Sequence, residues 1–193
     1  MVSGSPAMSK PSLFLVPDPL TSGEGTAAPP ALPDLAGLFR DHAGFVAALG
    51  TKLLGREAEV DDLVQDVFIR AMRGLKNLRD PGAVRGWLAA IAVRQASGRL
   101  ARRRLLRVFG LDTPHDYEWI ADESLDEQDR AALVDVYRAL DNLPPRLRIP
   151  WVLRFAQGEQ LDTIASLCGC SRATVKRRLE AAQTQLEGCL IHE

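Results

Sequence analysis

The chain has 193 residues, of which 46% are hydrophobic and 25% are charged, and its formal net charge is −1. This composition excludes wholesale disorder, and the lack of a long uncharged apolar run excludes a transmembrane helix, so we expect no membrane insertion. The apolar stretch 12–16 is too short for a secretory signal, so we expect a cytoplasmic protein whose cysteines stay reduced.

Residues 1–33 are rich in proline, serine, glycine, threonine and alanine, which predicts a disordered arm that buries little apolar surface. From Leu35 onward the apolar residues follow a helical period, and no alternating pattern predicts a strand. We therefore expect an all-α protein with two small helical domains, 34–104 and 131–193, joined by an acidic linker, 105–130. The expected helices cover residues 35–54, 57–77, 82–104, 126–141, 145–156, 160–167 and 171–188.

Charge is strongly segregated in the middle of the chain. Residues 81–110 contain seven arginines and no acid, whereas residues 111–130 contain eight acids and one base. The basic block suggests a polyanionic partner, and the acidic block suggests a solvated tether. The alternative is that the two blocks only offset each other.

The expected helix 57–77 has two different faces. One face is apolar and typical of a core, and it gathers Leu63, Val64, Val67, Phe68, Ala71 and Leu75. The opposite face carries Asp62, Gln65, Asp66 and Ile69. Acidic side chains around an apolar centre suit the docking of a basic partner. The alternative is a solvated face whose acids are favoured by the dipole of the helix N-terminus.

Arginines dominate the expected helix 82–104. Its apolar residues share one face, which we expect to pack on the preceding helix: Val84, Trp87, Leu88 and Ile91. Arg94, Arg99 and the run 102–104 are left to solvent or to phosphate, which a planar guanidinium suits. The polar turn 77–82 lies close to the tryptophan, and this combination suits an unstacked base, although a lone tryptophan is more often part of a core.

Residues 161–179 match the helix-turn-helix pattern. The small Ala165 lets two helices approach, Gly169 can adopt the positive φ of the turn, and Val175 fills the angle between the helices. Ser171 is a suitable N-cap for the second helix.

The second helix of this motif has a core stripe formed by Val175, Leu179, Ala182 and Leu186. Six residues at its N-terminal end face away from the stripe, where a recognition helix contacts the major groove. They are Arg172, Ala173, Thr174, Lys176, Arg177 and Arg178. The alternative is a helical hairpin with a solvated basic face.

Catalytic and metal-binding patterns are missing from the sequence. Cys168 and Cys170 have no second cysteine pair and form an incomplete zinc set, so we interpret them as packed free thiols, while a redox or metal role stays open. No Gly-rich phosphate loop, His-Glu-x-x-His motif or nucleophile elbow is present. We expect no catalytic residue, no metal and no cofactor, and we expect that the protein is not an enzyme.

With these features the chain resembles the extracytoplasmic-function (ECF) sigma factors of bacterial RNA polymerase, in the sigma-70 family. The resemblance spans about residues 35–187 and is most specific in four segments: 61–72, 87–104, 140–145 and 174–179. It implies a promoter-specificity subunit that binds promoter DNA and core RNA polymerase, at the β′ clamp helices and the β flap. It also implies control by an anti-sigma factor.

The resemblance assigns three groups of residues. Those that dock on the β′ clamp are Asp62, Gln65, Asp66, Phe68, Ile69 and Met72. Those that contact and melt the −10 element are Asn77, Arg79, Asp80, Arg85, Trp87, Arg94 and Arg99. Those that read the −35 element are Arg172, Ala173, Thr174, Lys176, Arg177 and Arg178. By the same resemblance, the acidic linker threads the catalytic cleft of the polymerase toward the RNA exit.

The sequence departs from the family pattern at the −10 group. Leu78 and Arg94 stand near positions where family members often have an aromatic residue and an asparagine, and Pro81-Gly82 lies in the melting loop. Two other functions fit parts of the pattern. One is a stand-alone DNA regulator that uses only the helix-turn-helix, although no dimerisation helix is evident. The other is an interaction module that docks on polymerase through residues 61–72 and inhibits it.

Overall fold

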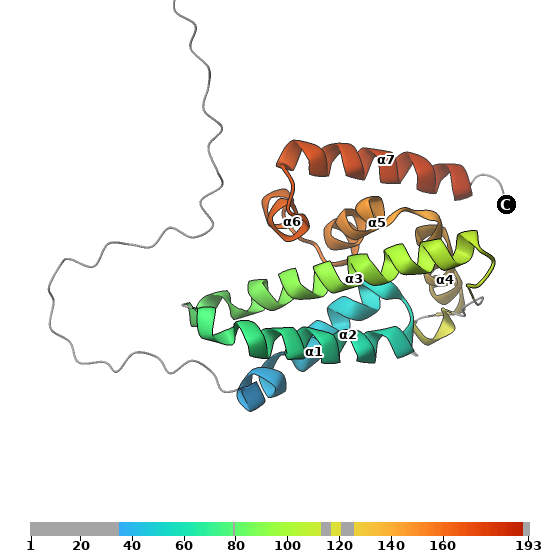
Figure 1. Cartoon of the computed structure of the whole chain (residues 1–193). Helices are drawn as coiled ribbons and strands as arrows, with labels where there is room; N and C mark the ends of the chain where they lie inside the picture. The colour runs from blue at the N-terminus through green and yellow to red at the C-terminus, as the bar shows by residue number, and fades with distance from the viewer. Residues whose placement is uncertain (1–34, 79, 113–116, 121–125, 191–193) are drawn as a thin grey trace, which may run out of the picture. The chain divides into compact units, whose positions relative to one another are not determined.

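The computed structural model describes residues 35–78, 80–112, 117–120 and 126–190. The described residues belong to one compact unit and form helices without any strand, so the all-α expectation is confirmed (Figure 1). None of the described helices is long and apolar enough to cross a membrane. The expected N-terminal arm lies outside the described residues.

Three long helices form the first half of this unit: α1 (Leu35–Leu54), α2 (Glu57–Gly74) and α3 (Val84–Val108). Each packs against the other two, because each has an apolar stripe at helical spacing. The expected core face of α2 is confirmed, since Leu63 and Val67 are fully buried. Two short 3₁₀ turns, Leu75–Asn77 and Pro81–Ala83, connect α2 to α3.

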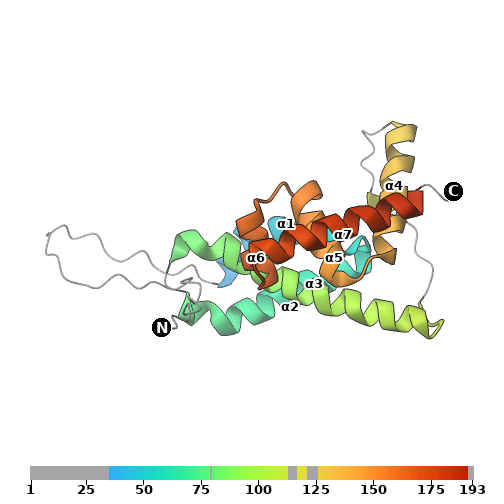
Figure 2. The same ribbon diagram turned by 90° about the horizontal axis from the view of Figure 1, so that it is seen from above.

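The second half contains shorter elements. They are a 3₁₀ turn (Glu118–Ile120), α4 (Glu127–Asn142), α5 (Pro145–Trp151), a π-helical turn (Val152–Ala156), α6 (Leu161–Cys168) and α7 (Arg172–Leu190). Asp126 caps α4 by accepting a hydrogen bond from the Asp129 amide at 2.8 Å. The helix α7 packs on both α5 and α6 (Figure 2).

The two halves share one hydrophobic core, because α3 packs against α5 and α6 as well as against α1 and α2. Helix α3 also extends to Val108, four residues beyond the expected end at 104. Arg107, in this added turn, donates to the Asp141 carbonyl at 2.6 Å, so a contact with α4 holds the extension in place. The domain boundaries expected from the sequence stay a prediction.

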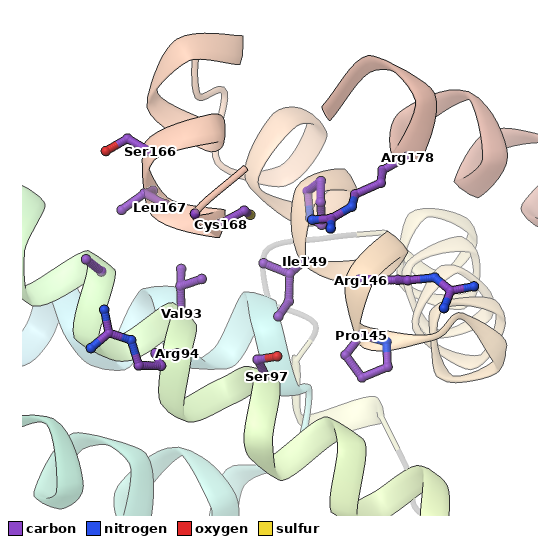
Figure 3. A pocket seen from close by; sticks show the side chains of 13 residues that line it. Val93, Arg94, Ser97, Pro145, Arg146, Ile149, Ser166, Leu167, Cys168 and Arg178 are labelled. Atoms are coloured by element: carbon purple, nitrogen blue, oxygen red, sulfur yellow. The ribbon is translucent and has the colours of Figure 1, made fainter. Parts of the chain in front are cut away.

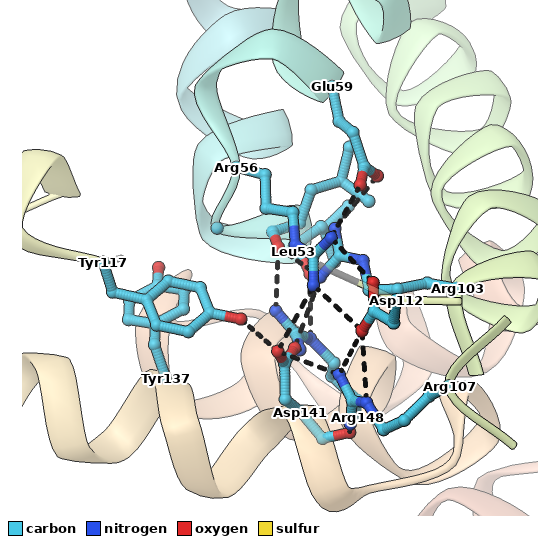
Figure 4. Close-up of polar contacts among 12 residues, drawn as sticks. Leu53, Arg56, Glu59, Arg103, Arg107, Asp112, Tyr117, Tyr137, Asp141 and Arg148 are labelled. Atoms are coloured by element: carbon cyan, nitrogen blue, oxygen red, sulfur yellow. Dashed lines mark hydrogen bonds and ion pairs between the residues drawn. The ribbon is translucent and has the colours of Figure 1, made fainter. Parts of the chain in front are cut away.

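A buried polar network lies where the end of α1 meets α4 and α5 (Figure 4). Arg148 is 1% exposed, and its guanidinium donates to the Asp141 carboxylate at 2.5 Å. It also donates to the carbonyls of Leu53 and Leu54, at 3.0 and 3.1 Å. The last carbonyls of a helix have no partner within the helix, so Arg148 supplies donors to two buried groups that need them.

Arg103 joins this network from α3, and its position corrects an expectation. The run 102–104 was expected to face solvent or phosphate, yet Arg103 is 5% exposed. It donates to the Leu54 carbonyl at 3.0 Å and forms ion pairs with Glu59 at 2.9 Å and Asp141 at 3.3 Å. Successive helical residues differ by about 100° in direction, so Arg103 turns inward while Arg102 and Arg104 stay exposed.

The start of the acidic block is anchored rather than solvated. Asp112 accepts hydrogen bonds from Arg56 at 3.1 and 3.2 Å, and from Arg107 at 3.2 Å. For this part of the linker the expectation of a solvated tether is therefore wrong. Its carboxylate is held because it neutralises arginines from two helix ends.

Two aromatic residues of the linker also contact the helices. The Tyr117 hydroxyl donates to the Asp141 carboxylate, and the Tyr117 ring stacks on that of Tyr137 with centroids 5.6 Å apart. The Trp119 indole donates to the Gly55 carbonyl at 3.1 Å. Gly55 has φ +73°, and a Cβ there would lie 2.8 Å from Tyr137 and 2.9 Å from Tyr117. The turn between α1 and α2 therefore requires glycine for both its backbone angle and its neighbours.

The network keeps its carboxylates ionised. Burial acts to raise the pKa of Asp141, but the attraction of Arg148, the Tyr117 hydrogen bond and Arg103 together lower that pKa below its ordinary value. The pKa of Asp112 is lowered in the same way, since Arg56 and Arg107 outweigh the effect of burial. Burial, followed by the hydrogen bond to Asp141, raises the pKa of Tyr117 to about 12.

Asp141→Asn tests how much the fold depends on this network. The change leaves the buried Arg148 charge without its carboxylate, so we expect the free energy of unfolding to fall by about 3 kcal/mol. Urea denaturation measures the loss. The matched control is Asp135→Asn on the same helix, where Asp135 pairs with Arg138 at 3.1 Å and both side chains are exposed. That variant changes the free energy of unfolding by less than about 1 kcal/mol. Similar losses in both variants would contradict a special role for Asp141.

Acid should weaken the fold through the same groups. A carboxyl whose folded pKa is lowered contributes full stability above its unfolded pKa, and the contribution is lost as the pH falls through the folded pKa. The ordinary value is 3.8, so the loss attributable to Asp141 occurs below that pH. Urea denaturation of the wild type and of Asp141→Asn over a series of acidic pH values measures it. We expect a steeper loss for the wild type, and parallel curves would argue against this assignment.

Candidate functional site

An apolar groove lies on the outer side of α1 and α2. Its volume is about 790 Å³. The predicted docking residues Gln65, Ile69 and Met72 line it, and Ile69 and Met72 are 46% and 51% exposed. Phe68 forms its floor, since the ring is only 6% exposed yet belongs to the lining. A groove with exposed large apolar side chains is typical of a protein–protein contact surface.

Helix α1 supplies the other half of this groove, and none of its residues was among those predicted from the sequence. Leu35, Ala36, Phe39 and Arg40 line it, and the Phe39 ring meets Phe68 edge-on with centroids 4.8 Å apart. Phe39 is 49% exposed. The signal was present as an apolar pair four residues apart at positions 35 and 39, but that spacing is equally typical of a core stripe.

The acidic residues beside the groove are paired with a predicted DNA-binding residue. Arg99 donates to the Asp66 carboxylate at 2.6 Å and lies 3.9 Å from Asp62. This cation between two carboxylates offsets the repulsion expected for like charges at i, i+4. The predicted polymerase-docking and −10 groups are therefore in direct contact through this pair.

The turn that joins α2 to α3 is held by a local hydrogen bond. The Asp80 carboxylate accepts from the Gly82 amide at 2.8 Å, which fixes the entry to the Pro81–Ala83 turn. Asn77 ends the preceding 3₁₀ turn. Arg79 lies outside the described residues. Arg85 is exposed and places its guanidinium 4.1 Å from the centre of the Phe45 ring.

A basic hollow surrounds the half-buried Trp87. Its volume is about 340 Å³, and Arg70, Arg73, Ile91 and Arg94 belong to its lining. Trp87 packs closely on the backbone of α2, where a Cβ on Gly74 would lie 2.9 Å from the ring. Trp87 and Arg94 were predicted from the sequence, whereas Arg70 and Arg73 of α2 were not. An aromatic surface with guanidinium groups around it can bind a stacked base and its phosphate.

The helix-turn-helix has the predicted geometry. Gly169 ends α6 with φ +60°, which is the left-handed conformation expected for the turn. The Ser171 hydroxyl accepts from the Thr174 amide at 3.2 Å and caps α7. Val175 and Ala182 are fully buried, and Leu186 is 6% exposed, so the core stripe of α7 is confirmed.

The predicted −35 residues do not all face the same way. Arg172, Ala173, Lys176 and Arg177 are exposed, and Thr174 is half-buried. Arg178 differs, because its guanidinium donates to the Cys170 sulfur at 3.5 Å and it lines a cavity that also contains Arg94 of α3. The expectation that Arg178 faces away with the others is therefore wrong in this arrangement, since helical spacing brings it back beside the turn.

The two cysteines of the turn are half-buried free thiols, as the sequence analysis interpreted them. Burial and the neighbouring Cys170 raise the pKa of Cys168 to about 11, so this thiol is neutral at physiological pH. Among the described residues, no three histidine, cysteine or acidic side chains gather in a way that could hold a metal ion.

Comparison with known proteins identifies both halves of the fold. Residues 38–105 match Sigma-70 region 2, and residues 133–186 match Sigma-70, region 4. The chain is 32% identical over 171 residues to an ECF RNA polymerase sigma factor, SigE, of Mycolicibacterium smegmatis, covering 86% of this chain and 65% of that protein. It is 30% identical over 142 residues to the RNA polymerase sigma factor SigV of Bacillus subtilis, covering 74% of this chain and 82% of that one.

Solved structures show the same fold. CnrH, solved with the cytosolic domain of CnrY, is 25% identical with a TM-score of 0.55, covering 82% of this chain and 88% of that one. The sigma factor RpoE of Bartonella quintana, solved with the anti-sigma factor NepR, is 22% identical with a TM-score of 0.59. That match covers 80% of this chain and 95% of that one.

The two matched regions, the relatives and the all-helical fold agree with one another, and we conclude that this chain belongs to the sigma-70 family of RNA polymerase sigma factors, among its ECF members.

Proposed function

We propose that the chain binds core RNA polymerase and directs it to promoters that carry a −10 and a −35 element. Its part in transcription is binding and strand opening, and the phosphodiester chemistry belongs to the polymerase. The observation that carries this proposal is that one chain presents three distinct surfaces: an apolar groove, a basic hollow around a tryptophan, and an exposed basic recognition helix. A stand-alone DNA regulator would need only the last of these.

The groove is the surface for the polymerase. Ile69, Met72 and Phe39 offer exposed apolar area, while Asp62 and Asp66 lie beside it. A basic helical partner such as the β′ clamp helices would bury the apolar side chains and meet the carboxylates. Arg99 positions Asp66 for that contact through the 2.6 Å hydrogen bond. Residues 131–193 would contact the β flap, as the family resemblance implies.

The hollow and the recognition helix are the surfaces for promoter DNA. Trp87 with Arg70, Arg73 and Arg94 suits an unstacked base of the −10 element and its phosphate. The exposed end of α7 suits the major groove of the −35 element. Arg94 and Arg178 line the same cavity here, so α6 and α7 must move away from α3 before both elements can be read.

The cellular setting follows from the family. We place the protein in the cytoplasm with the polymerase and expect an anti-sigma factor as its regulator. The sigma factor RpoE of Bartonella quintana, which has a similar fold, was solved in complex with the anti-sigma factor NepR, and this supports the proposed regulator.

Transcription with purified components tests the whole proposal. Core polymerase is supplied with a library of genomic fragments, with and without the protein. We expect new start sites that share a bipartite upstream element and depend on the protein. Polymerase binding without new transcripts would indicate an inhibitor, and DNA binding without polymerase binding would indicate a simple regulator; either result overturns the proposal.

Asp66→Arg tests the docking surface. The substitution reverses the charge beside the groove and repels both Arg99 and a basic partner, so we expect capture of core polymerase to fall at least tenfold, or about 1.4 kcal/mol. Binding to immobilised core enzyme measures the loss. Asp61→Arg is the matched control, since it makes the same charge change at an exposed position of the same helix. Thermal unfolding verifies that both variants fold. Undiminished capture by Asp66→Arg would exclude this surface.

Arg177→Ala tests base reading by α7. Arg177 is exposed at the N-terminal end of the helix, and we expect the variant to lose about 1–3 kcal/mol of affinity for duplexes with the −35 element. Fluorescence anisotropy compares that duplex with one in which the element is scrambled. A phosphate contact would weaken both duplexes alike, so equal losses would defeat the base-reading role. Arg138→Ala, at an exposed position of α4, controls for the general loss of charge.

A further inference from the structure

The cavity between α3 and the helix-turn-helix has an unusual charge composition. Its volume is about 370 Å³, and its lining contains Arg94, Arg146 and Arg178 but no acidic residue. Figure 3 shows Arg178 extending from α7 toward Ile149, with Arg94 and Arg146 at the edges. Arg94 and Arg146 are exposed and Arg178 is half-buried, so solvent screens part of their mutual repulsion, and an anion between Arg94 and Arg178 would neutralise the rest.

The other charges of the described chain do not supply that anion. Within the described residues, Arg94 and Arg146 make no hydrogen bond or ion pair, and Arg178 donates to the Cys170 sulfur at 3.5 Å. Cys168, also in the lining, is a neutral thiol because burial raises its pKa. The arginines of the polar network differ, since Arg148 and Arg103 are matched by carboxylates.

The rest of the lining suits a small organic anion. Ser97 and Ser166 provide hydroxyls, and Val93, Ile149 and Leu167 provide an apolar wall. Planar guanidinium groups bind phosphate oxygens with paired hydrogen bonds, while an apolar wall suits a flat ring. A volume of this size is at the lower end of the range for small-ligand sites, which is about 300–1,000 Å³.

We propose that this cavity binds a small phosphate-bearing anion of nucleotide size. The ligand would be contacted by Arg94 from α3 and by Arg178 from α7, and it would therefore hold the two halves of the fold together. If the proposed function is correct, the bound ligand would also occupy Arg94 of the −10 surface and Arg178 of the −35 surface, so that neither could contact promoter DNA. The binding itself involves neither polymerase nor DNA.

Isothermal titration of the full chain at low ionic strength tests the proposal directly. The probes are pyrophosphate, ATP and adenosine. We expect saturable binding of pyrophosphate and ATP and none of adenosine. Tighter binding of ATP would identify a nucleotide as the ligand class, and equal affinity would identify the phosphates alone. Binding of adenosine alone, or no binding of either phosphate, would overturn the proposal.

Substitutions locate the site. We expect Arg94→Ala and Arg178→Ala each to weaken binding by about tenfold, because each removes charge-assisted hydrogen bonds. Arg104→Ala is the matched control, since it removes an exposed arginine of α3 outside the cavity. Equal weakening in the control would show non-specific attraction and overturn the proposal.

Thermal unfolding supplies an independent readout. A ligand that binds only the folded chain raises its unfolding temperature, and the rise grows with the ratio of the ligand concentration to the Kd. At one pyrophosphate concentration, we expect the unfolding temperature of the wild type and of Arg104→Ala to rise by similar amounts, and that of Arg178→Ala to rise less. A shift in Arg178→Ala as large as that of the wild type would place the ligand elsewhere and overturn the proposal.

Discussion

The Asp141 carboxylate is the acceptor on which the association of the two halves depends. It receives Arg148 at 2.5 Å, Arg107 at 3.2 Å and Arg103 at 3.3 Å, besides the Tyr117 hydroxyl. Desolvating arginine is costly, and attraction to a carboxylate offsets the cost only when the remaining donors also have acceptors. The carbonyls of Leu53 and Leu54 supply acceptors for Arg148 and for one nitrogen of Arg103, whereas the Arg103 Nε has no such acceptor within the described residues. The same network therefore pairs the last carbonyls of α1, neutralises the buried arginines and holds the first three helices against α4 and α5.

Helix α3 belongs to both the structural and the ligand-binding parts of the protein. On its inner side, Arg103 and Arg107 are used in the network. On its outer side, Arg94 lies in both the hollow around Trp87 and the cavity beside α7. Arg99, which lies between Arg94 and Arg103 in the sequence, donates a hydrogen bond to the Asp66 carboxylate of α2. One arginine-rich helix thus serves several functions because its period presents successive residues in different directions.

Local patterns in the sequence predicted much of this molecule. The helices, the core face of α2 and the turn at Gly169 follow from apolar spacing and from the backbone freedom of glycine, which act over a few residues. The burial of Arg103 could not be predicted, because Asp141 and Leu54 lie 38 and 49 residues away. A run of three arginines looks uniformly exposed until such partners are known.

In the candidate site, too, the features set by local spacing were predicted and those set by distant partners were not. The α2 half of the groove was predicted from its mixed face, whereas Phe39 of α1, which is 49% exposed, has a spacing from Leu35 that is equally typical of a core stripe. The inward turn of Arg178 depends on α6 and α3, which no local pattern specifies. The expected solvation of the acidic block failed at Asp112 for a similar reason, since its partners Arg56 and Arg107 come from other helices.

Gly55 has a consequence for how sequence variation would affect this protein. A turn glycine with positive φ is usually replaceable at the modest cost of backbone strain. Here the missing side chain also leaves room for the rings of Tyr117 and Tyr137, and its carbonyl receives Trp119. Any larger residue would push against the linker and α4, although Gly55 itself belongs to none of the three surfaces proposed for polymerase and promoter DNA. Such a substitution would weaken the packing of the linker and α4 against α1 and α2. It would therefore favour separation of the two halves of the fold without changing any residue proposed to contact polymerase or DNA.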